Sequence, residues 1–143
     1  MPRSTIALAA LAITALSAPP ITAATRCYPP QRYVLTATEV FDAKTGLTWQ
    51  RQFDPSGRAW AGAKSFCTGG FRLPSVKELF TIVDGTRELP AIDLNVFPGT
   101  PGEIFWSSTP DLALASDAWA VRFHNGSVRT GPKASLYLVR CVR

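Results

Sequence analysis

The residue types that could support catalysis are few, and they are not spaced as catalytic groups usually are. Ser107 and Ser108 are adjacent hydroxyls, and His124 is the single histidine of the chain. A serine nucleophile needs a base within hydrogen-bonding reach. His124 directly precedes Asn125-Gly126, which is a turn signal, and a histidine at a turn is usually a solvated side chain. The sequence therefore does not predict an enzyme.

The three cysteines, Cys27, Cys67 and Cys141, are the next candidates for chemistry. None of them has a C-x-x-C spacing, which argues against a zinc site and against thioredoxin-like redox chemistry. Cysteines of exported chains usually form disulfides. Because three is an odd number, one cysteine remains free or pairs outside this chain.

Calcium is the metal to consider, because it binds oxygen ligands and needs six to eight of them. The acidic residues are dispersed along the chain. Only Asp84, Glu88 and Asp93 could converge, through folding of the segment that carries them. We therefore expect no cofactor, with calcium at these three acids as the alternative.

The first residues have the order of a secretory signal peptide. Arg3 precedes the uncharged run Ile6–Ala18, which Pro19 and Pro20 end, and small residues follow with a cleavage site near Ala24. The run is shorter than the roughly 20 residues of a membrane-spanning helix, so we expect no integral membrane span. Residues 1–24 are predicted to be removed, and the chain is predicted to be secreted, either periplasmic or extracellular.

The chain is basic, with 15 lysines and arginines against 10 acidic residues and a net charge of +5. Its C-terminal part contains five basic residues and no acid: Arg122, Arg129, Lys133, Arg140 and Arg143. Such a surface favours an anionic glycan or a cell surface, or is simply solvated. Nucleic acid is not expected, because no nucleic-acid-binding module is recognisable.

Short strands are predicted in the N-terminal third, over residues 33–36, 40–41 and 47–49, with a turn over residues 42–46. Residues 54–57 read as a loop. A first helix is predicted from Trp60, because Trp60, Ala63 and Cys67 share one helical face.

A second helix is predicted after Ser75, which forms a capping box with Glu78. Its apolar stripe comprises Val76, Leu79, Phe80 and Val83. Residues 86–102, rich in proline and glycine, predict a long ordered loop with Ile92 and Phe97 as core anchors.

The C-terminal third is predicted to be β-structure, with strands over residues 104–109, 119–124, 127–130 and 136–142. Asn125-Gly126 predicts a tight hairpin turn. The expected fold is α+β, with two helices packed on a twisted antiparallel sheet. Core packing is the expected role of the four tryptophans, Trp49, Trp60, Trp106 and Trp119.

A ligand surface, if present, is predicted on the outward face of this hairpin and on the long loop. The candidate residues are Arg122, His124, Asn125, Arg129 and Asp93. Polar side chains on a rigid hairpin can bind a glycan or a protein with little loss of conformational entropy.

Seven motifs occur in one order over residues 40–143, and together they resemble the Lcl C-terminal domain family of bacterial secreted proteins. They are VFDAKTGLTWQR (40–51), WAGA with Cys67, FRLPS with Glu78-Leu79, Ile92-Asp93, FPGT (97–100), FWSST (105–109) and VRCVR (139–143). The resemblance covers most of the chain beyond the signal peptide and leaves residues 25–39 as an N-terminal segment.

The resemblance implies a C-type-lectin-like fold, distantly similar to formylglycine-generating enzymes. It also implies a disulfide between Cys67 and Cys141, which agrees with the apolar faces on which both cysteines lie. Cys27, ahead of the motifs, would then be unpaired or intermolecular.

Three functions follow as hypotheses. The first is a secreted, non-enzymatic binding or adhesion module for a glycan or protein at the cell surface or envelope. The second is a catalyst related to the formylglycine-generating enzymes, which the absence of a matching cysteine pair disfavours. The third is a structural envelope protein without a small-molecule ligand.

Overall fold

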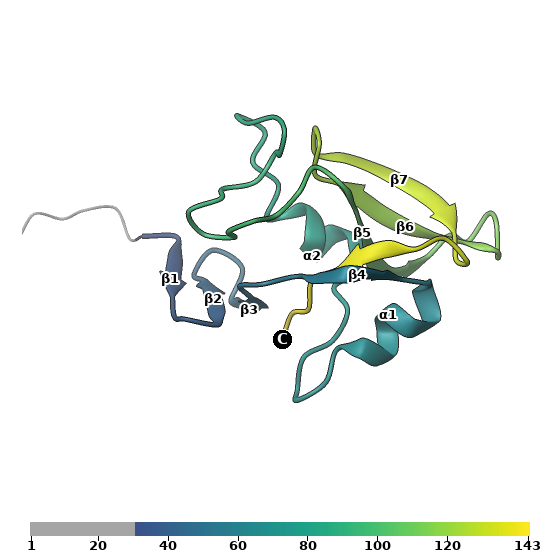
Figure 1. The fold of residues 1–143 in the computed structure, drawn as a ribbon, viewed down its shortest axis with the longest axis horizontal. Coiled ribbons are helices and arrows are strands. Elements are labelled where there is room, and N and C mark those ends of the chain that lie inside the picture. Colours follow the sequence, from purple (N-terminus) through teal and green to yellow (C-terminus); the bar gives the residue numbers. More distant parts are fainter. Residues whose placement is uncertain (1–30) are drawn as a thin grey trace, which may run out of the picture.

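The computed structural model describes residues 31–143, which form two β-sheets and two helices (Figure 1). A three-stranded sheet has the order β1-β2-β3, and a five-stranded sheet has the order β4-β8-β5-β6-β7. The chain is therefore mixed α+β, as expected. The predicted signal peptide and Cys27 lie outside the described residues.

The three-stranded sheet is an antiparallel meander of β1 (Tyr33–Leu35), β2 (Glu39–Asp42) and β3 (Leu47–Gln50). The β2–β3 turn is closed by Asp42, whose carbonyl accepts the amides of Thr45 and Gly46. Gly46 has φ +73°, a left-handed conformation that favours glycine. The predicted hairpin is confirmed.

Residues 54–57, predicted to be a loop, instead belong to strand β4 (Asp54–Arg58). β4 is an edge strand that pairs with β8 only at Asp54 and Arg58, with a register shift between them. An edge strand with an irregular register tolerates Pro55, which has no amide to donate. Because residues 54–57 are of types common in turns, the sequence pattern alone predicts a loop at this position.

The core of the five-stranded sheet is the antiparallel set β5 (Ile104–Pro110), β6 (Asp117–Arg122) and β7 (Ser127–Pro132). β8 (Tyr137–Val139) lies between β4 and β5, antiparallel to β4 and parallel to β5. The sheet is thus mixed rather than wholly antiparallel.

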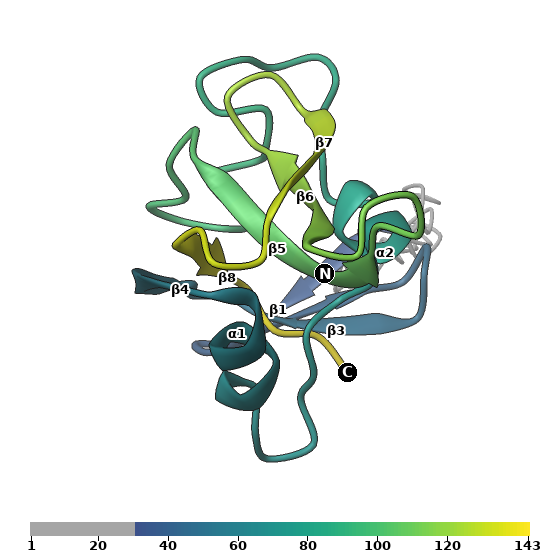
Figure 2. The same cartoon turned by 90° about the vertical axis from the view of Figure 1, so that its right-hand side faces the viewer.

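The two helices lie on opposite sides of β5 (Figure 2). α1 (Trp60–Phe66) packs through Ala63 against a cluster that includes Trp106, Ala120 and Val139. α2 (Val76–Phe80) packs through Leu79 against a second cluster. That second cluster comprises Val40, Trp49, Leu79, Ile82, Ile92, Val96, Phe97, Phe105, Val121, Phe123 and Val142.

The capping box of α2 is confirmed, since the Ser75 hydroxyl accepts the Glu78 amide and the Glu78 carboxylate accepts the Ser75 amide. The helix ends at Phe80, earlier than the apolar stripe predicts. Phe80 is 50% exposed, whereas Val83 packs against the core from beyond the helix. Ile82, which lies outside the predicted stripe, takes the buried position.

The long loop is confirmed, because residues 86–102 contain no helix or strand. Its anchors Ile92 and Phe97 are 1% and 0% exposed. The β6–β7 connection differs from the expected two-residue turn. It spans residues 123–126, with Arg122 paired to Ser127, and only Gly126 has a positive φ.

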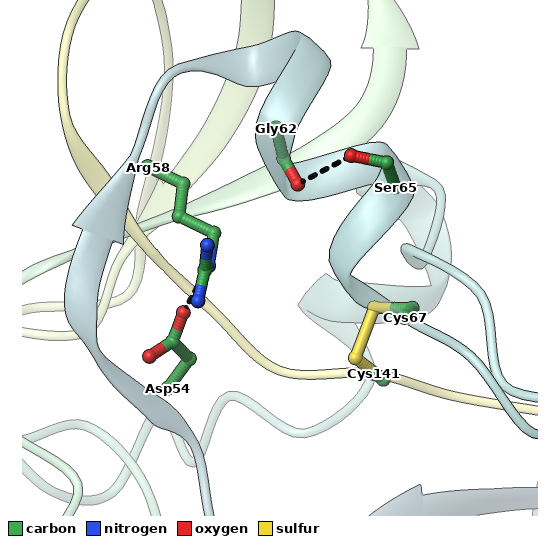
Figure 3. The surroundings of a disulfide bond; sticks show 6 residues. All are labelled: Asp54, Arg58, Gly62, Ser65, Cys67 and Cys141. Atoms are coloured by element: carbon green, nitrogen blue, oxygen red, sulfur yellow. Dashed lines mark hydrogen bonds and ion pairs between the residues drawn. A yellow bond between two sulfur atoms is a disulfide. The ribbon is translucent and has the colours of Figure 1, made fainter.

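Two of the four tryptophans, Trp49 and Trp106, are completely buried. Trp60 and Trp119 are partly exposed, so core packing describes them less well. A disulfide joins Cys67, at the C-terminal end of α1, to Cys141, with 5.7 Å between the Cα atoms (Figure 3). The disulfide implied by the family resemblance is present.

Candidate binding site

The residues predicted to bind a ligand lie at separate places in the structure. Arg122 and Arg129 are exposed and share the sheet face of Ala120, which packs toward α1. His124 and Asn125 lie in the β6–β7 connection, which contacts the long loop through a hydrogen bond from the Leu89 amide to the His124 carbonyl. These residues remain candidates, distributed over β6, β7, the connection between them and the long loop.

Asp84, just before the long loop, and Asp93, within it, both lie near the Arg87 guanidinium. The Arg87 guanidinium lies 2.8 Å from the Asp84 carboxylate and 3.7 Å from that of Asp93. Within residues 31–143, no three histidine, cysteine or acidic side chains come close enough to hold a metal ion. Two of the three acids of the calcium alternative, Asp84 and Asp93, thus lie near one arginine, which is a cation of the protein itself. The third, Glu88, is exposed and forms no ion pair within residues 31–143.

Asp93 also lines a cavity of about 270 Å³ beside Arg32 and Tyr33. Arg32 makes two hydrogen bonds to the Asp42 carboxylate and one to the Thr81 carbonyl. Burial raises the pKa of Tyr33 to about 12, so its hydroxyl stays protonated. Arg32 at this cavity thus links β2 to the end of α2.

A groove of about 370 Å³ offers a better arrangement for binding. It lies between β2, β3, the start of β4 and the segment on either side of Cys67. Its lining combines two amides, two carboxylates, a hydroxyl and three aromatic rings: Thr38, Glu39, Gln50, Gln52, Phe53, Asp54, Phe66 and Phe71. Ligand sites combine apolar and aromatic walls with polar groups that orient the ligand, and this groove has both, with polar residues in the majority.

Both carboxylates of the groove are paired with arginines that also lie over two of its three aromatic rings. Arg143 lies 2.8 Å from Glu39 and 4.8 Å from the ring centre of Phe71. Arg58 bonds Asp54 and lies 4.2 Å from the ring centre of Phe66 (Figure 3 shows the ion pair). The same unit of acid, arginine and phenylalanine thus occurs twice, and each unit fixes a ring in place.

Asp54 is held ionised. Burial raises the pKa of its carboxyl, but hydrogen bonds from the Ser56 amide and from Arg58 outweigh burial, so the pKa lies below its ordinary value. Asp54 therefore lacks the raised pKa of a general acid.

The groove also has side chains without internal partners. Among the hydrogen bonds of the described residues, none involves the side chains of Thr38, Gln50 or Gln52. Amide and hydroxyl groups both donate and accept hydrogen bonds. Three such groups are available to a polar ligand.

The backbone behind the groove is fixed by Arg140, which is 0% exposed. Its guanidinium donates to the carbonyls of Gln50 and Arg51 at 2.9 and 2.6 Å and to the Thr100 hydroxyl at 2.6 Å. Within residues 31–143, no ion pair includes Arg140. Burial lowers the pKa of Arg140 to about 9.

Sequence patterns alone do not predict this groove. Gln50 belongs to a family motif, Asp54 reads as part of a loop, and Phe66 and Phe71 flank a structural cysteine. The only local signal is the alternation of Gln50 and Gln52, which places two amides on one side of an extended segment. Arg143, which pairs with Glu39 and lies over Phe71, comes from far along the chain.

These features define a small α+β domain in which a disulfide joins a helix to the closing segment (residues 140–143, after β8) beside a groove with polar and aromatic walls. The chain belongs to the Lcl C-terminal domain family, whose family model matches residues 38–143. The resemblance seen in the motifs is thereby confirmed. No curated protein matches the sequence. No helix among residues 31–143 has the length and apolarity needed to cross a bilayer.

Proposed function

We propose that this chain is an exported, non-enzymatic binding module that recognises a glycan in the groove between β2, β3 and the Cys67 segment. The groove is the observation that carries the proposal. Gln50, Gln52 and Thr38 supply donors and acceptors for sugar hydroxyls, and Phe66 and Phe71 supply flat apolar surfaces against which sugar C–H groups can pack.

Rigidity of the groove supports a binding role. Cys67 joins the wall that carries Phe66 and Phe71 to the closing segment, and Arg140 fixes the carbonyls of Gln50 and Arg51. A site that is already ordered loses little conformational entropy when a ligand binds. Such a module would select its ligand through hydrogen bonds and aromatic contacts.

The chemistry of the groove also favours binding over catalysis. Glycoside hydrolysis requires one carboxylic acid with a raised pKa and a second carboxylate. Asp54 has the opposite shift, and the thiols of Cys67 and Cys141 are in a disulfide. His124, the one candidate base, does not line the groove.

We further propose that the fold is of the C-type-lectin-like kind and that the domain acts at the cell surface or in the envelope. The two helices on opposite sides of β5 and the disulfide between α1 and the closing segment support the first proposal. The signal-peptide pattern of residues 1–24 supports the second. An experimental structure with another strand order would contradict the lectin-like fold, and retention inside the cell would contradict export.

A glycan array, followed by titration of any positive glycan, tests the binding proposal. We expect Gln52→Ala and Gln50→Ala to weaken binding about tenfold each, because each removes hydrogen bonds to the ligand. Gln31→Ala is the matched control, since Gln31 is an exposed glutamine outside the groove. Repeating the titration with a chelator tests the calcium alternative.

If no glycan binds with or without calcium, the glycan proposal is wrong, and a protein ligand or a structural envelope role takes its place. Equal losses in the Gln31→Ala and Gln52→Ala variants would place the ligand outside the groove.

A further inference from the structure

The outward face of the three-stranded sheet carries two apolar side chains that do not pack in the core. Val34 on β1 is 56% exposed and Phe41 on β2 is 42% exposed. Neither belongs to the two buried clusters or to the side chains packed against them. Val34 pairs with Phe41 across the two strands, and such partners lie on one face of a sheet. The two side chains therefore form an apolar pair that is open to solvent.

This pair continues onto the neighbouring strand and onto the closing segment. Phe41 pairs with Thr48 on β3. Thr48 exchanges two backbone hydrogen bonds with Arg143, at 2.8 and 2.9 Å. Residues that face each other in this way have their side chains on the same side of the sheet. Arg143 thus lies beside Thr48 on the outward face.

The segment after Cys67 adds a fifth member. Val142 pairs with Arg72 in the antiparallel sense. The residues next to them, Arg143 and Phe71, therefore lie opposite each other as well. In agreement, the Arg143 guanidinium lies 4.8 Å from the ring centre of Phe71. The result is one cross-sheet row of side chains over five neighbouring segments, which in order are Val34, Phe41, Thr48, Arg143 and Phe71.

The cross-sheet row is continuous with the groove. Phe71, at one end of the row, lines the groove itself. Glu39 lines it too, and it lies two residues before Phe41 on β2, which places both on one face. Gln50 has the same relation to Thr48 on β3. The groove and the row are therefore parts of one surface.

The row is long in comparison with a single sugar. Neighbouring strands lie about 4.8 Å apart, so the four steps from Val34 to Phe71 span about 19 Å. This distance is several times the width of one sugar ring. The two phenylalanines of the row, Phe41 and Phe71, are separated by the Thr48 hydroxyl and the Arg143 guanidinium. Aromatic and hydrogen-bonding groups thus follow one another along the row.

Contacts within the protein order the row before a ligand binds. The Arg143 guanidinium lies 2.8 Å from the Glu39 carboxylate, and the Arg143 backbone is paired with Thr48. The disulfide of Cys141 holds the closing segment in place. A preordered surface loses little conformational entropy on binding.

We propose that the ligand of the groove is an extended β-1,4-linked oligosaccharide that continues along the cross-sheet row, with one sugar ring stacked on Phe41. The proposal rests on the glycan-binding function proposed above. A β-1,4-linked chain of glucose-type sugars is extended, and its rings present C–H groups on their faces. These faces can pack against Phe71 and Phe41, while Thr48 and Arg143 bond to the hydroxyls between them.

Titration with oligosaccharides of two lengths tests the proposal. The probes are the disaccharide and the hexasaccharide of two series, β-1,4-linked glucose and β-1,4-linked N-acetylglucosamine. The two series distinguish a site that selects hydroxyls from one that selects acetamido groups. We expect the hexasaccharide of at least one series to bind about tenfold more tightly than its disaccharide, because only the longer chain reaches from the groove to Phe41.

Phe41→Ala should weaken binding of that hexasaccharide about tenfold and leave binding of the disaccharide unchanged. Phe80→Ala is the matched control, because Phe80 is an exposed phenylalanine on α2, outside the row and the groove. Gln52→Ala, in the groove, should weaken binding of both lengths. Thermal unfolding checks that each variant is folded.

A variant on β1 repeats the test at a second position. We expect Val34→Ser to weaken binding of the hexasaccharide about threefold, since it removes a smaller apolar contact. Val128→Ser is its control, because Val128 is 41% exposed on β7 of the other sheet. It should bind like the wild type.

Equal affinity for the two lengths in both series overturns the proposal, and so does a loss in Phe41→Ala no larger than that in Phe80→Ala. Equal weakening of both lengths by Phe41→Ala would make the row a site of its own, which also contradicts an extension of the groove. If neither series binds, the extended chain is wrong, while the groove is still judged by the glycan array and by Gln52→Ala. A hexasaccharide that depends on Phe41 but not on Gln52 would contradict the groove itself.

Discussion

Arg140 shows how one side chain organises several distant segments. Its guanidinium is fully buried and donates through its two terminal nitrogens to two carbonyls and a hydroxyl in place of a carboxylate, while its buried Nε has no hydrogen-bond partner among residues 31–143. It also lies 4.8 Å from the ring centre of Phe97, the anchor of the long loop. The charge therefore joins β3, the long loop and the closing segment at one point, although burying it without an acid is unfavourable.

We expect Arg140→Lys to destabilise the protein by about 2–3 kcal/mol, because an ammonium cannot reproduce the planar fork that donates to Gln50, Arg51 and Thr100 together. Urea unfolding monitored by tryptophan fluorescence measures the change. Arg129→Lys is the control, since Arg129 is exposed on β7. Equal stability of the two variants would show that Arg140 contributes nothing beyond its charge.

At the scale of elements, α2 is notable because it has only five residues and depends on its first turn. Two hydrogen bonds from Arg72, the first of several interactions, lower the pKa of Glu78 from 4.5 to about 2. The same carboxylate accepts the Ser75 amide. The start of the helix thus depends on an ionised Glu78.

A carboxyl whose pKa is lower in the folded state stabilises the fold above the unfolded pKa and loses this effect as pH falls. We expect Glu78 to contribute about 1–2 kcal/mol above pH 4.5 and progressively less down to about pH 2, after allowance for solvent screening at the exposed Arg72. Glu78→Gln should lower the free energy of unfolding at neutral pH. It should also reduce the loss of stability between pH 4.5 and about pH 2.

Denaturant midpoints taken across this pH range measure the effect. Glu88→Gln is the control, because Glu88 is exposed and has no ion pair within residues 31–143. A steep acid limb that persists in Glu78→Gln would mean that another carboxyl controls acid unfolding.

Local patterns predicted the elements well where local contacts decide them. The Ser75–Glu78 capping box predicted the start of α2, and alternation over residues 119–124 located β6 (Asp117–Arg122) to within two residues. The patterns failed where pairing with a strand distant in sequence determines the local structure. Asp54–Arg58 has the residue types of a turn, but pairing with β8 makes it a strand.

At the scale of the whole molecule, the disulfide joins segments separated by 74 residues. Closing a loop of this length stabilises the fold by about 4 kcal/mol in the chain-entropy model. We expect Cys67→Ser/Cys141→Ser to lose about that much, measured by chemical unfolding, and to become insensitive to reductant. Cys27→Ser is the control, and it should unfold like the wild type if Cys27 is unpaired.

The groove is the part of the molecule that sequence patterns did not predict, and the reason lies in its construction. Thr38 and Gln52 are unremarkable polar residues, and Glu39 meets Arg143 across 104 positions of the sequence. A periodic pattern within a short stretch of sequence cannot predict a contact between residues so far apart. Arg122 and His124, in contrast, could be selected as candidates from the sequence, because the turn beside them is predicted by the adjacent residues Asn125-Gly126.

The path of residues 137–143 has a consequence for the order of folding during synthesis. β8 is inserted between β4 and β5, and the residues after it pair with Thr48, Gln50 and Arg72 and carry Cys141 (Figure 1). A chain that emerges with its N-terminus first therefore presents most of its apolar surface before the strand that joins the two halves of the sheet is available. We therefore expect the five-stranded sheet to be completed only when this stretch emerges, a delay that is compatible with the export proposed above.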